Sequence, residues 1–182
     1  MPEIIHAAPV VPRPQLALTA QGLTAATWER LAENSGATIL VDGRVEFICV
    51  GLRAGDVVTN LLIAIDVAGV TMTLSKVGLY DKTGTRLAVS ADQGAGWAST
   101  GLKTIAVATP YTVPIDDGYY VAIVGKATTL PRPASAAFDS KALLAVGSGM
   151  APLGIQTGQT DLPSSATITF SGTGNAYWVG VS

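Results

Sequence analysis

The chain has 182 residues, of which 48% are hydrophobic and 13% are charged, and its formal net charge is −2 at pH 7. The negative charge and the absence of a Lys/Arg cluster argue against nucleic-acid binding. No apolar run approaches the ~20 residues of a membrane helix. Because an ordinary soluble domain carries about 25% charged residues, the charge deficit indicates a surface that packs against partners, unless Gly, Ser and Thr solvate it.

Residues 1–36 predict an extended arm followed by one short helix. Four prolines favour extended or polyproline II backbone in the arm: Pro2, Pro9, Pro12 and Pro14. Thr24 is a candidate N-cap and Gly36 a candidate helix end. Two interpretations remain open, an arm that anchors the chain on a neighbour and a tail folded on its own domain. The candidate assembly contacts are the apolar residues Ile4, Ile5, Val10, Val11, Leu16 and Trp28.

Residues 37–182 predict one antiparallel β-sandwich or jelly roll. The pair Asp42-Gly43 predicts a hairpin between strands at 37–41 and 44–50, with Val45, Phe47 and Cys49 facing inward. Further short strands at 57–65, 70–79, 86–90, 103–108, 111–113 and 119–124 are separated by turn residues, which is typical of a sandwich. The last of these strands is entered through the turn residues Asp116-Asp117-Gly118. We expect Val45, Phe47, Val121 and Ile123 in the core.

Three irregularities are expected in this sandwich. The parity of the apolar residues changes between 74 and 77, so we expect a β-bulge or a corner near Ser75–Lys76. The segment Asp81-Lys82-Thr83-Gly84 predicts a turn closed by a left-handed glycine. Long loops are expected around a strand at 141–146, and a terminal hairpin is expected between 166–170 and 176–181.

The residues needed for catalysis are scarce. The only histidine, His6, lies in the proline-rich arm, and the only cysteine is Cys49. Zinc sites need more Cys and His than this. The aspartates near loops lack the spacing of a calcium loop, so turn formation is the favoured interpretation. We therefore expect no catalytic residues, no cofactor and no metal.

The aromatic residues allow two interpretations. Trp97, in the loop at 91–100, is the best candidate for stacking against a sugar, and Asp92 and Tyr120 are further candidate contacts for a ligand or a host surface. The alternative, which we favour, is that Trp97 closes one end of the sandwich while Tyr119 and Tyr120 lie on opposite faces of a sheet.

Four motifs occur in order: Gly78-Leu79-Tyr80-Asp81, Gly84-Thr85-Arg86-Leu87-Ala88, Gly96-Trp97-Ala98-Ser99-Thr100-Gly101-Leu102-Lys103, and Tyr111-Thr112-Val113-Pro114 with Gly118-Tyr119-Tyr120-Val121-Ala122. This order resembles a β-sandwich module of structural proteins from tailed bacteriophages that infect actinobacteria, often labelled minor tail proteins. The resemblance spans residues 44–126, and the family has no catalytic residues to carry over. It implies a virion component.

Together these features predict a non-enzymatic virion protein made in the host cytoplasm without a signal peptide. A tail-associated protein with a role in host recognition is the first interpretation, a capsid-decoration or head-fibre protein the second, and a carbohydrate-binding module the third. The expected partners are other virion proteins, a host cell-surface glycan in the recognition role, and further copies of the chain, with a trimer favoured. We expect no membrane insertion.

Overall fold

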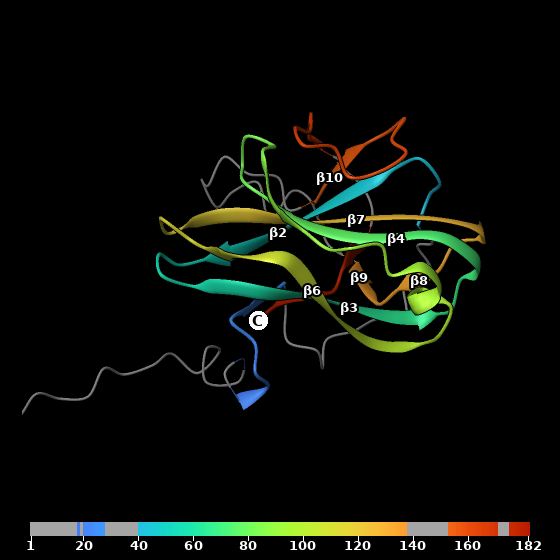
Figure 1. The fold of residues 1–182 in the computed structure, drawn as a ribbon, viewed down its shortest axis with the longest axis horizontal. Coiled ribbons are helices and arrows are strands. Elements are labelled where there is room, and N and C mark those ends of the chain that lie inside the picture. Colours follow the sequence, from blue (N-terminus) through green and yellow to red (C-terminus); the bar gives the residue numbers. More distant parts are fainter. Residues whose placement is uncertain (1–17, 19, 28–39, 138–152, 171–174) are drawn as a thin grey trace, which may run out of the picture.

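Two antiparallel sheets pack face to face in the computed structural model, which describes residues 18, 20–27, 40–137, 153–170 and 175–182 (Figure 1). The prediction of an all-β sandwich is confirmed. The elements are β1 (Ala25–Ala26), β2 (Val45–Leu52), β3 (Val57–Val67), β4 (Val70–Tyr80), β5 (Arg86–Val89), the 3-10 helix η2 (Gly94–Trp97), β6 (Gly101–Thr112), β7 (Asp117–Thr129), β8 (Arg132–Pro133), β9 (Ser135–Ala137), β10 (Leu153–Gln156), β11 (Thr169–Phe170), β12 (Asn175–Tyr177) and β13 (Val179–Val181).

The larger sheet has six strands in the order β11-β10-β2-β7-β4-β5, and the smaller follows the order β1-β13-β3-β6, with β8 also paired to β3. β9 and β12 form a separate two-stranded ladder. Every pairing among the described strands is antiparallel. Segments far apart in the sequence are therefore neighbours, since β13 lies between β1 and β3.

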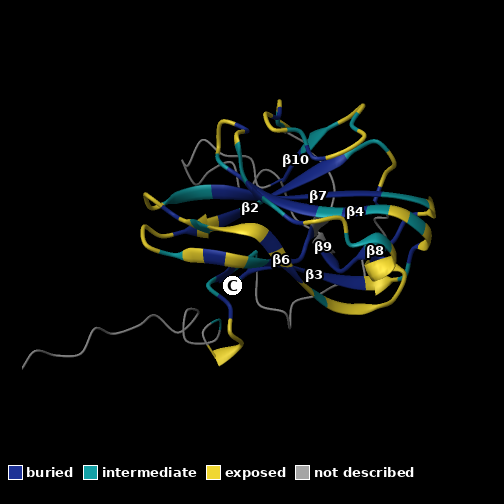
Figure 2. Cartoon of the chain, viewed as in Figure 1, coloured by how far each residue is buried: buried dark blue, intermediate teal, exposed yellow. Residues whose placement is uncertain are grey.

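Both faces of the six-stranded sheet carry buried apolar residues, most densely along β2 and β7 (Figure 2). Ile48, Val121 and Ile123 face the other sheet, whereas Val45 and Phe47 belong to a second cluster on the opposite face. The four residues that we placed in the core are all 0% exposed, so their burial is confirmed. The expected direction of β2 is wrong, because an outer layer of chain buries the face that alternation alone assigns to the interior.

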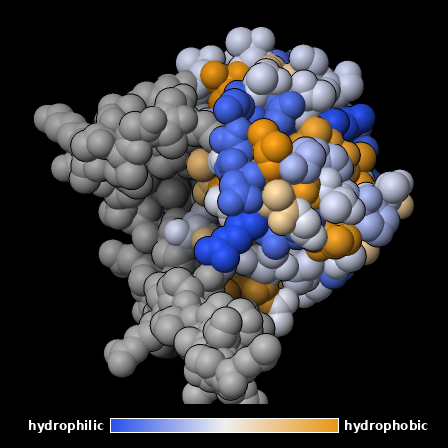
Figure 3. Space-filling model, turned by 90° about the vertical axis from the view of Figure 1, so that its left-hand side faces the viewer, coloured by the Kyte–Doolittle hydropathy of each residue, from blue (hydrophilic) through white to orange (hydrophobic). Residues whose placement is uncertain are grey.

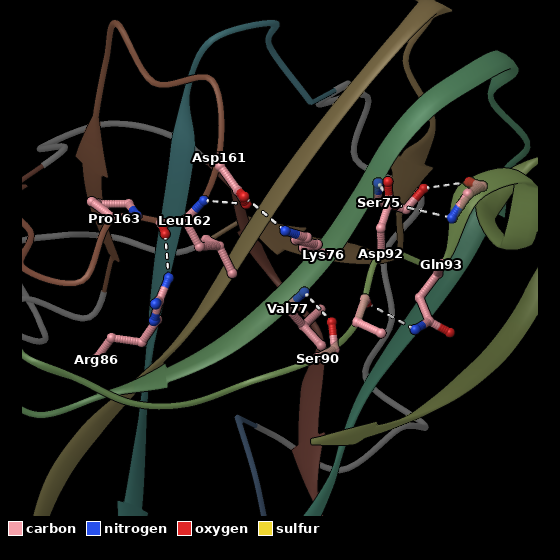
Figure 4. A network of polar contacts seen from close by, with 12 residues as sticks. Ser75, Lys76, Val77, Arg86, Ser90, Asp92, Gln93, Asp161, Leu162 and Pro163 are labelled. Atoms are coloured by element: carbon pink, nitrogen blue, oxygen red, sulfur yellow. Dashed lines mark hydrogen bonds and ion pairs between the residues drawn. The ribbon is translucent and has the colours of Figure 1, made fainter. Parts of the chain in front are cut away.

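That outer layer is the strap, residues 157–168, which contributes Leu162, Ala166 and Ile168 to the second cluster. The Tyr80 hydroxyl donates to the carbonyl of Pro163 at 2.6 Å, and the Arg86 guanidinium donates to the carbonyl of Leu162. Lys76 Nζ lies 2.7 Å from Asp161 Oδ2 (Figure 4). These contacts tie the strap to strands β4 and β5 of the six-stranded sheet.

The outer face of the smaller sheet carries a third apolar cluster, which contains Leu62, Ala64 and Trp178 and is covered by Leu23 and Leu18. The amides of Thr24 and Thr27 donate to the carbonyls of Val181 and Val179 at 2.7 and 3.1 Å. The expected start of a helix at Thr24 is therefore wrong, because β1 uses this backbone for pairing with β13. Residues 28–35 of that helix lie outside the described residues.

Three other expectations need correction. Residues 40 and 41 form no strand, although Gly43 turns with φ +68°; the neighbours of β2 are β7 and β10. The irregularity of β4 falls between Met72 and Leu74 rather than at Ser75–Lys76. The terminal hairpin is absent among the described strands, since β11 pairs with β10 and β12 with β9. In the first and third cases a partner distant in sequence replaces the local one. The strand expected at 141–146 lies outside the described residues.

Candidate functional site

Three turns meet at the end of the sandwich where β3 begins and β6 ends, at the left of Figure 1. The amide of Ala54, between β2 and β3, donates to Asp116 Oδ1 at 2.7 Å. Lys82 Nζ, between β4 and β5, lies 2.7 Å from Asp117 Oδ2. We call this region the open end; Figure 3 looks onto it and shows hydrophobic residues beside hydrophilic ones.

A surface hollow of about 170 Å³ lies at the open end. Its apolar walls come from Leu87, Tyr111, Pro114, Ile115 and Tyr119. Asp81, Lys82, Thr83, Asp117 and Gly118 complete the lining. Ile115 is 57% exposed, whereas Tyr119 is buried and donates from its hydroxyl to the carbonyl of Ile115 at 3.2 Å. The hollow thus combines apolar walls with a charged rim.

Both carboxylates of the rim favour the ionised form. Burial acts to raise the pKa of Asp81, but hydrogen bonds from Thr83 and Thr85 outweigh it and hold this pKa below its ordinary value. The hydrogen bond from Lys82 lowers the pKa of Asp117, and Asp117 in turn raises the pKa of Lys82. Burial, followed by the neighbouring Tyr111, raises the pKa of Tyr119. Two carboxylates and one ammonium therefore border the hollow at neutral pH.

The predicted sugar contact Trp97 lies elsewhere, at the opposite end of the sandwich. Its side chain is 0% exposed and belongs to the core between the sheets. Its carbonyl accepts from the amide of Gly69 at 3.0 Å, where β3 turns into β4. A buried indole presents no face to a ligand, so the structure corrects the contact interpretation and agrees with the core interpretation.

The other two predicted ligand contacts have structural roles. Tyr120 is buried in the second cluster, with its ring centroid 6.2 Å from that of Phe47. Asp92 is exposed, but its Oδ1 accepts from the amides of Ser75 and Gly94 at 2.9 and 3.0 Å (Figure 4). The structure therefore does not bring Trp97, Asp92 and Tyr120 together into a site.

The six candidate assembly contacts, Ile4, Ile5, Val10, Val11, Leu16 and Trp28, lie outside the described residues. His6 also lies outside them. The part of the arm that is described, from Leu18 to Thr27, contacts its own domain through Leu18 and β1.

The sequence reasoning missed the hollow because it treated Tyr111 and Tyr119 as sandwich residues. One signal was available. Ile115, a large aliphatic residue, follows Pro114 and precedes Asp116-Asp117 in a predicted turn, where a polar residue is the usual choice. An aliphatic side chain in a short turn has no buried position within the turn itself.

A buried ion pair forms the other notable polar cluster. Glu46 is 1% exposed, and its Oε1 accepts from Arg44 Nε at 2.6 Å. Burial raises the pKa of Glu46, although Arg44 opposes this effect. Burial and then the charge of Glu46 raise the pKa of Tyr177. Arg44 thus compensates a charge inside the sandwich, a structural role.

Groups suited to metal binding are absent from the described part of the chain, where no three His, Cys, Asp or Glu side chains gather. The thiol of Cys49 is half-buried, and burial, followed by the charge of Asp117, raises its pKa to about 11. This thiol stays protonated at neutral pH, which is the unreactive form. Within the described residues, no helix is long and apolar enough to cross a membrane.

Comparison with known proteins finds no match: no family model, no curated protein and no solved structure matches the chain.

Proposed function

We propose that this chain is a non-enzymatic structural component of a bacteriophage virion, associated with the tail and exposed on the particle. The capsid-decoration interpretation is the alternative within the same class. The observation that carries the proposal is a surface suited to packing against other proteins: large aliphatic side chains stand exposed on a chain with only 11 basic and 13 acidic residues.

The exposed aliphatic residues gather at both ends of the sandwich. Val57 and Ile115 are 48% and 57% exposed at the open end. At the opposite end Val67, Val70 and Leu102 are 45%, 54% and 40% exposed, near the turn between β3 and β4 and at the start of β6. A particle in which copies stack end to end would bury these residues, and each would contribute about 25 cal/mol per Å² of apolar area covered.

The turn expected at Asp81-Lys82-Thr83-Gly84 is present. Gly84 adopts φ +88°, and the amide of Gly84 donates to the carbonyl of Asp81 at 3.1 Å. The Asp81–Gly84 segment is therefore a left-handed glycine turn between β4 and β5, as its residue types predict. The carbohydrate-binding alternative loses its supporting observation, because Trp97 and Tyr120 are buried.

A mass-spectrometric census of purified phage particles that encode this chain tests the proposal. We expect the protein in the particle. Hundreds of copies per particle would indicate a capsid or tail-tube position, and a few copies would indicate the tail tip. Absence of the protein from particles in infected cells that produce it would overturn the virion assignment.

Deletion of residues 2–16 tests the arm separately. If the arm is an anchor, the truncated protein keeps nearly the melting temperature of the full chain but fails to enter the particle, because Leu18 to Thr27 still pair with the domain. Normal incorporation, or an unfolded truncated protein, would show that the arm is not an anchor.

A further inference from the structure

We propose that the hollow at the open end binds the proline-rich segment 9–14 of a neighbouring copy. This inference rests on the proposed role of the arm in assembly and adds the receptor site and its chemistry. The segment reads Pro9-Val10-Val11-Pro12-Arg13-Pro14 and lies outside the described residues.

The walls of the hollow suit a polyproline II ligand. Proline-rich segments of the form Pro-x-x-Pro bind aromatic-lined grooves because their extended backbone is already ordered. The half-buried Tyr111 supplies the aromatic surface, and the exposed Pro114 and Ile115 extend it. A hollow of about 170 Å³ is well below the roughly 300–1,000 Å³ of sites that enclose drug-sized ligands, so it accepts one or two side chains of a passing segment.

The spacing of the segment matches this use. A polyproline II helix has 3 residues per turn, so Pro9 and Pro12 lie on the same face. Arg13 and Val11 then face other directions, and Arg13 can reach the rim while Pro12 occupies the hollow. Since the φ of each proline is fixed before binding, docking costs less conformational entropy than it would for a flexible segment.

The rim is complementary to Arg13. The hydrogen bonds that Asp81 accepts from Thr83 and Thr85 all end on Oδ1, which leaves Oδ2 for a further donor. Asp117 Oδ2 lies 2.7 Å from Lys82 Nζ, and Asp117 Oδ1 accepts from the amide of Gly118 at 2.9 Å. Lys82 is 53% exposed, and a guanidinium binds a carboxylate with more specific geometry than an ammonium does, so Arg13 can replace Lys82 as the partner of Oδ2.

A second copy is the favoured source of the segment because of Val57. This residue is 48% exposed at the same end and is not among the residues that line the hollow. A neighbouring copy brings further surface together with its arm. Repeated in one direction, such an arm-to-hollow contact joins copies head to tail, which closes a ring when the rotation permits.

Site-specific photocrosslinking in the full chain tests the position of the segment. A benzophenone amino acid replaces Val11, and we expect a crosslinked product of two chains whose bridge maps to residues 111–119. A matched full chain with the benzophenone at Val41, which is exposed elsewhere, should not give this bridge. A product within one chain, or a bridge that maps to the Val67–Val70 end, would overturn the inference.

A charge exchange tests the pairing in the same assay. Arg13→Asp or Asp117→Arg alone should reduce the two-chain product by about tenfold, the loss of one charge-assisted pair, and the double variant should regain it. Asp66→Arg is the control, since this exposed aspartate lies at the far end of β3 and pairs with Arg132. Equal product in every variant, with circular dichroism showing folded protein, would refute the pairing. Normal entry into particles despite that result would leave the proposed function standing.

Discussion

The two ends of the sandwich differ in the exposure of an aromatic residue, since Trp97 is buried at one end and Tyr111 is only half-buried at the other. At one end η2 folds inward, and Asp92 fixes it by accepting from the amides of Ser75 and Gly94, so Trp97 fills the core. At the open end Asp116 accepts a hydrogen bond from the backbone amide of Ala54, and Asp117 pairs with Lys82. Neither contact involves an aromatic side chain. Tyr111 and Ile115 stay accessible there. Whether an aromatic residue near a loop is accessible to a ligand thus depends on the hydrogen bonds that hold its loop against the sheets.

The largest expected effect separates the two ends. Trp97→Ala should lower the free energy of unfolding by about 3–5 kcal/mol, because the change leaves a cavity in the core. Ile115→Ala at the open end should change it by no more than about 0.5 kcal/mol, as expected for an exposed side chain. Chemical denaturation of both variants measures the difference. Similar losses would mean that the open end is as well packed as the other.

The glycine turn of the open end offers a second test. Gly84 has φ +88°, and a Cβ there would lie 2.1 Å from the carbonyl oxygen of Ala166 in the strap. Gly84→Ala should therefore cost about 2–3 kcal/mol. Gly55→Ala is the matched control, since Gly55 has φ +90° with no atom near its Cβ, and the backbone conformation alone should cost about 1 kcal/mol. If the two variants melt at the same temperature, the strap does not restrict this turn.

The hydrogen bonds that hold η2 in place can be tested by substitution of Asp92. Asp92→Ala removes the acceptor of two backbone amides, one of them from the buried Ser75, and should cost about 1–2 kcal/mol. Asp92→Asn keeps an oxygen in the same place and should retain most of the stability. A further readout is the fluorescence of Trp97, which should shift to longer wavelength in the alanine variant as water reaches the indole. An unshifted spectrum would show that η2 holds its place without Asp92.

The smallest effect concerns pH at the open end. The pKa of Asp81 is lower in the folded protein than its ordinary value of about 3.9. Its carboxylate therefore stabilises the fold at neutral pH, and this contribution is lost as the pH falls through the lowered pKa. Asp81→Asn should make unfolding less dependent on pH below about pH 5. The raised pKa of Glu46 acts in the opposite direction, but it is present in both proteins and cancels in their difference. Parallel pH profiles would contradict this account.

Much of the fold could be predicted from local patterns. The alternation in β2 and β7, and the turn residues before β3, β5 and β7, are properties of short segments, and each predicted strand there is present. Which face of β2 meets the other sheet could not be predicted in this way. The strap that buries Phe47 is more than 100 residues distant, and no local rule links the two.

The candidate site was the less predictable part for a related reason. Trp97 and Tyr111 both lie in or next to a predicted loop, and the residues around them in the sequence do not show which of the two side chains is buried. The burial of Trp97 depends on contacts between segments distant in sequence. The amide of Ser75 donates to Asp92, which precedes the 3-10 helix that carries Trp97. The local hint was Ile115, whose side chain cannot be buried within its own turn.

The position of β13 between β1 and β3 bears on how the molecule folds. Thr27 and Val179 pair across 152 positions of sequence, so the smaller sheet is complete only after a very long loop closes. Closing such a loop costs entropy before any contact rewards it, and sandwiches rich in nonlocal pairings fold slowly, in about milliseconds to seconds. We therefore expect β3 and β6 to pair early and β1 to dock last. During that interval the apolar face of Leu62 and Ala64 is uncovered, and it is then that the chain is most prone to associate with the wrong partner.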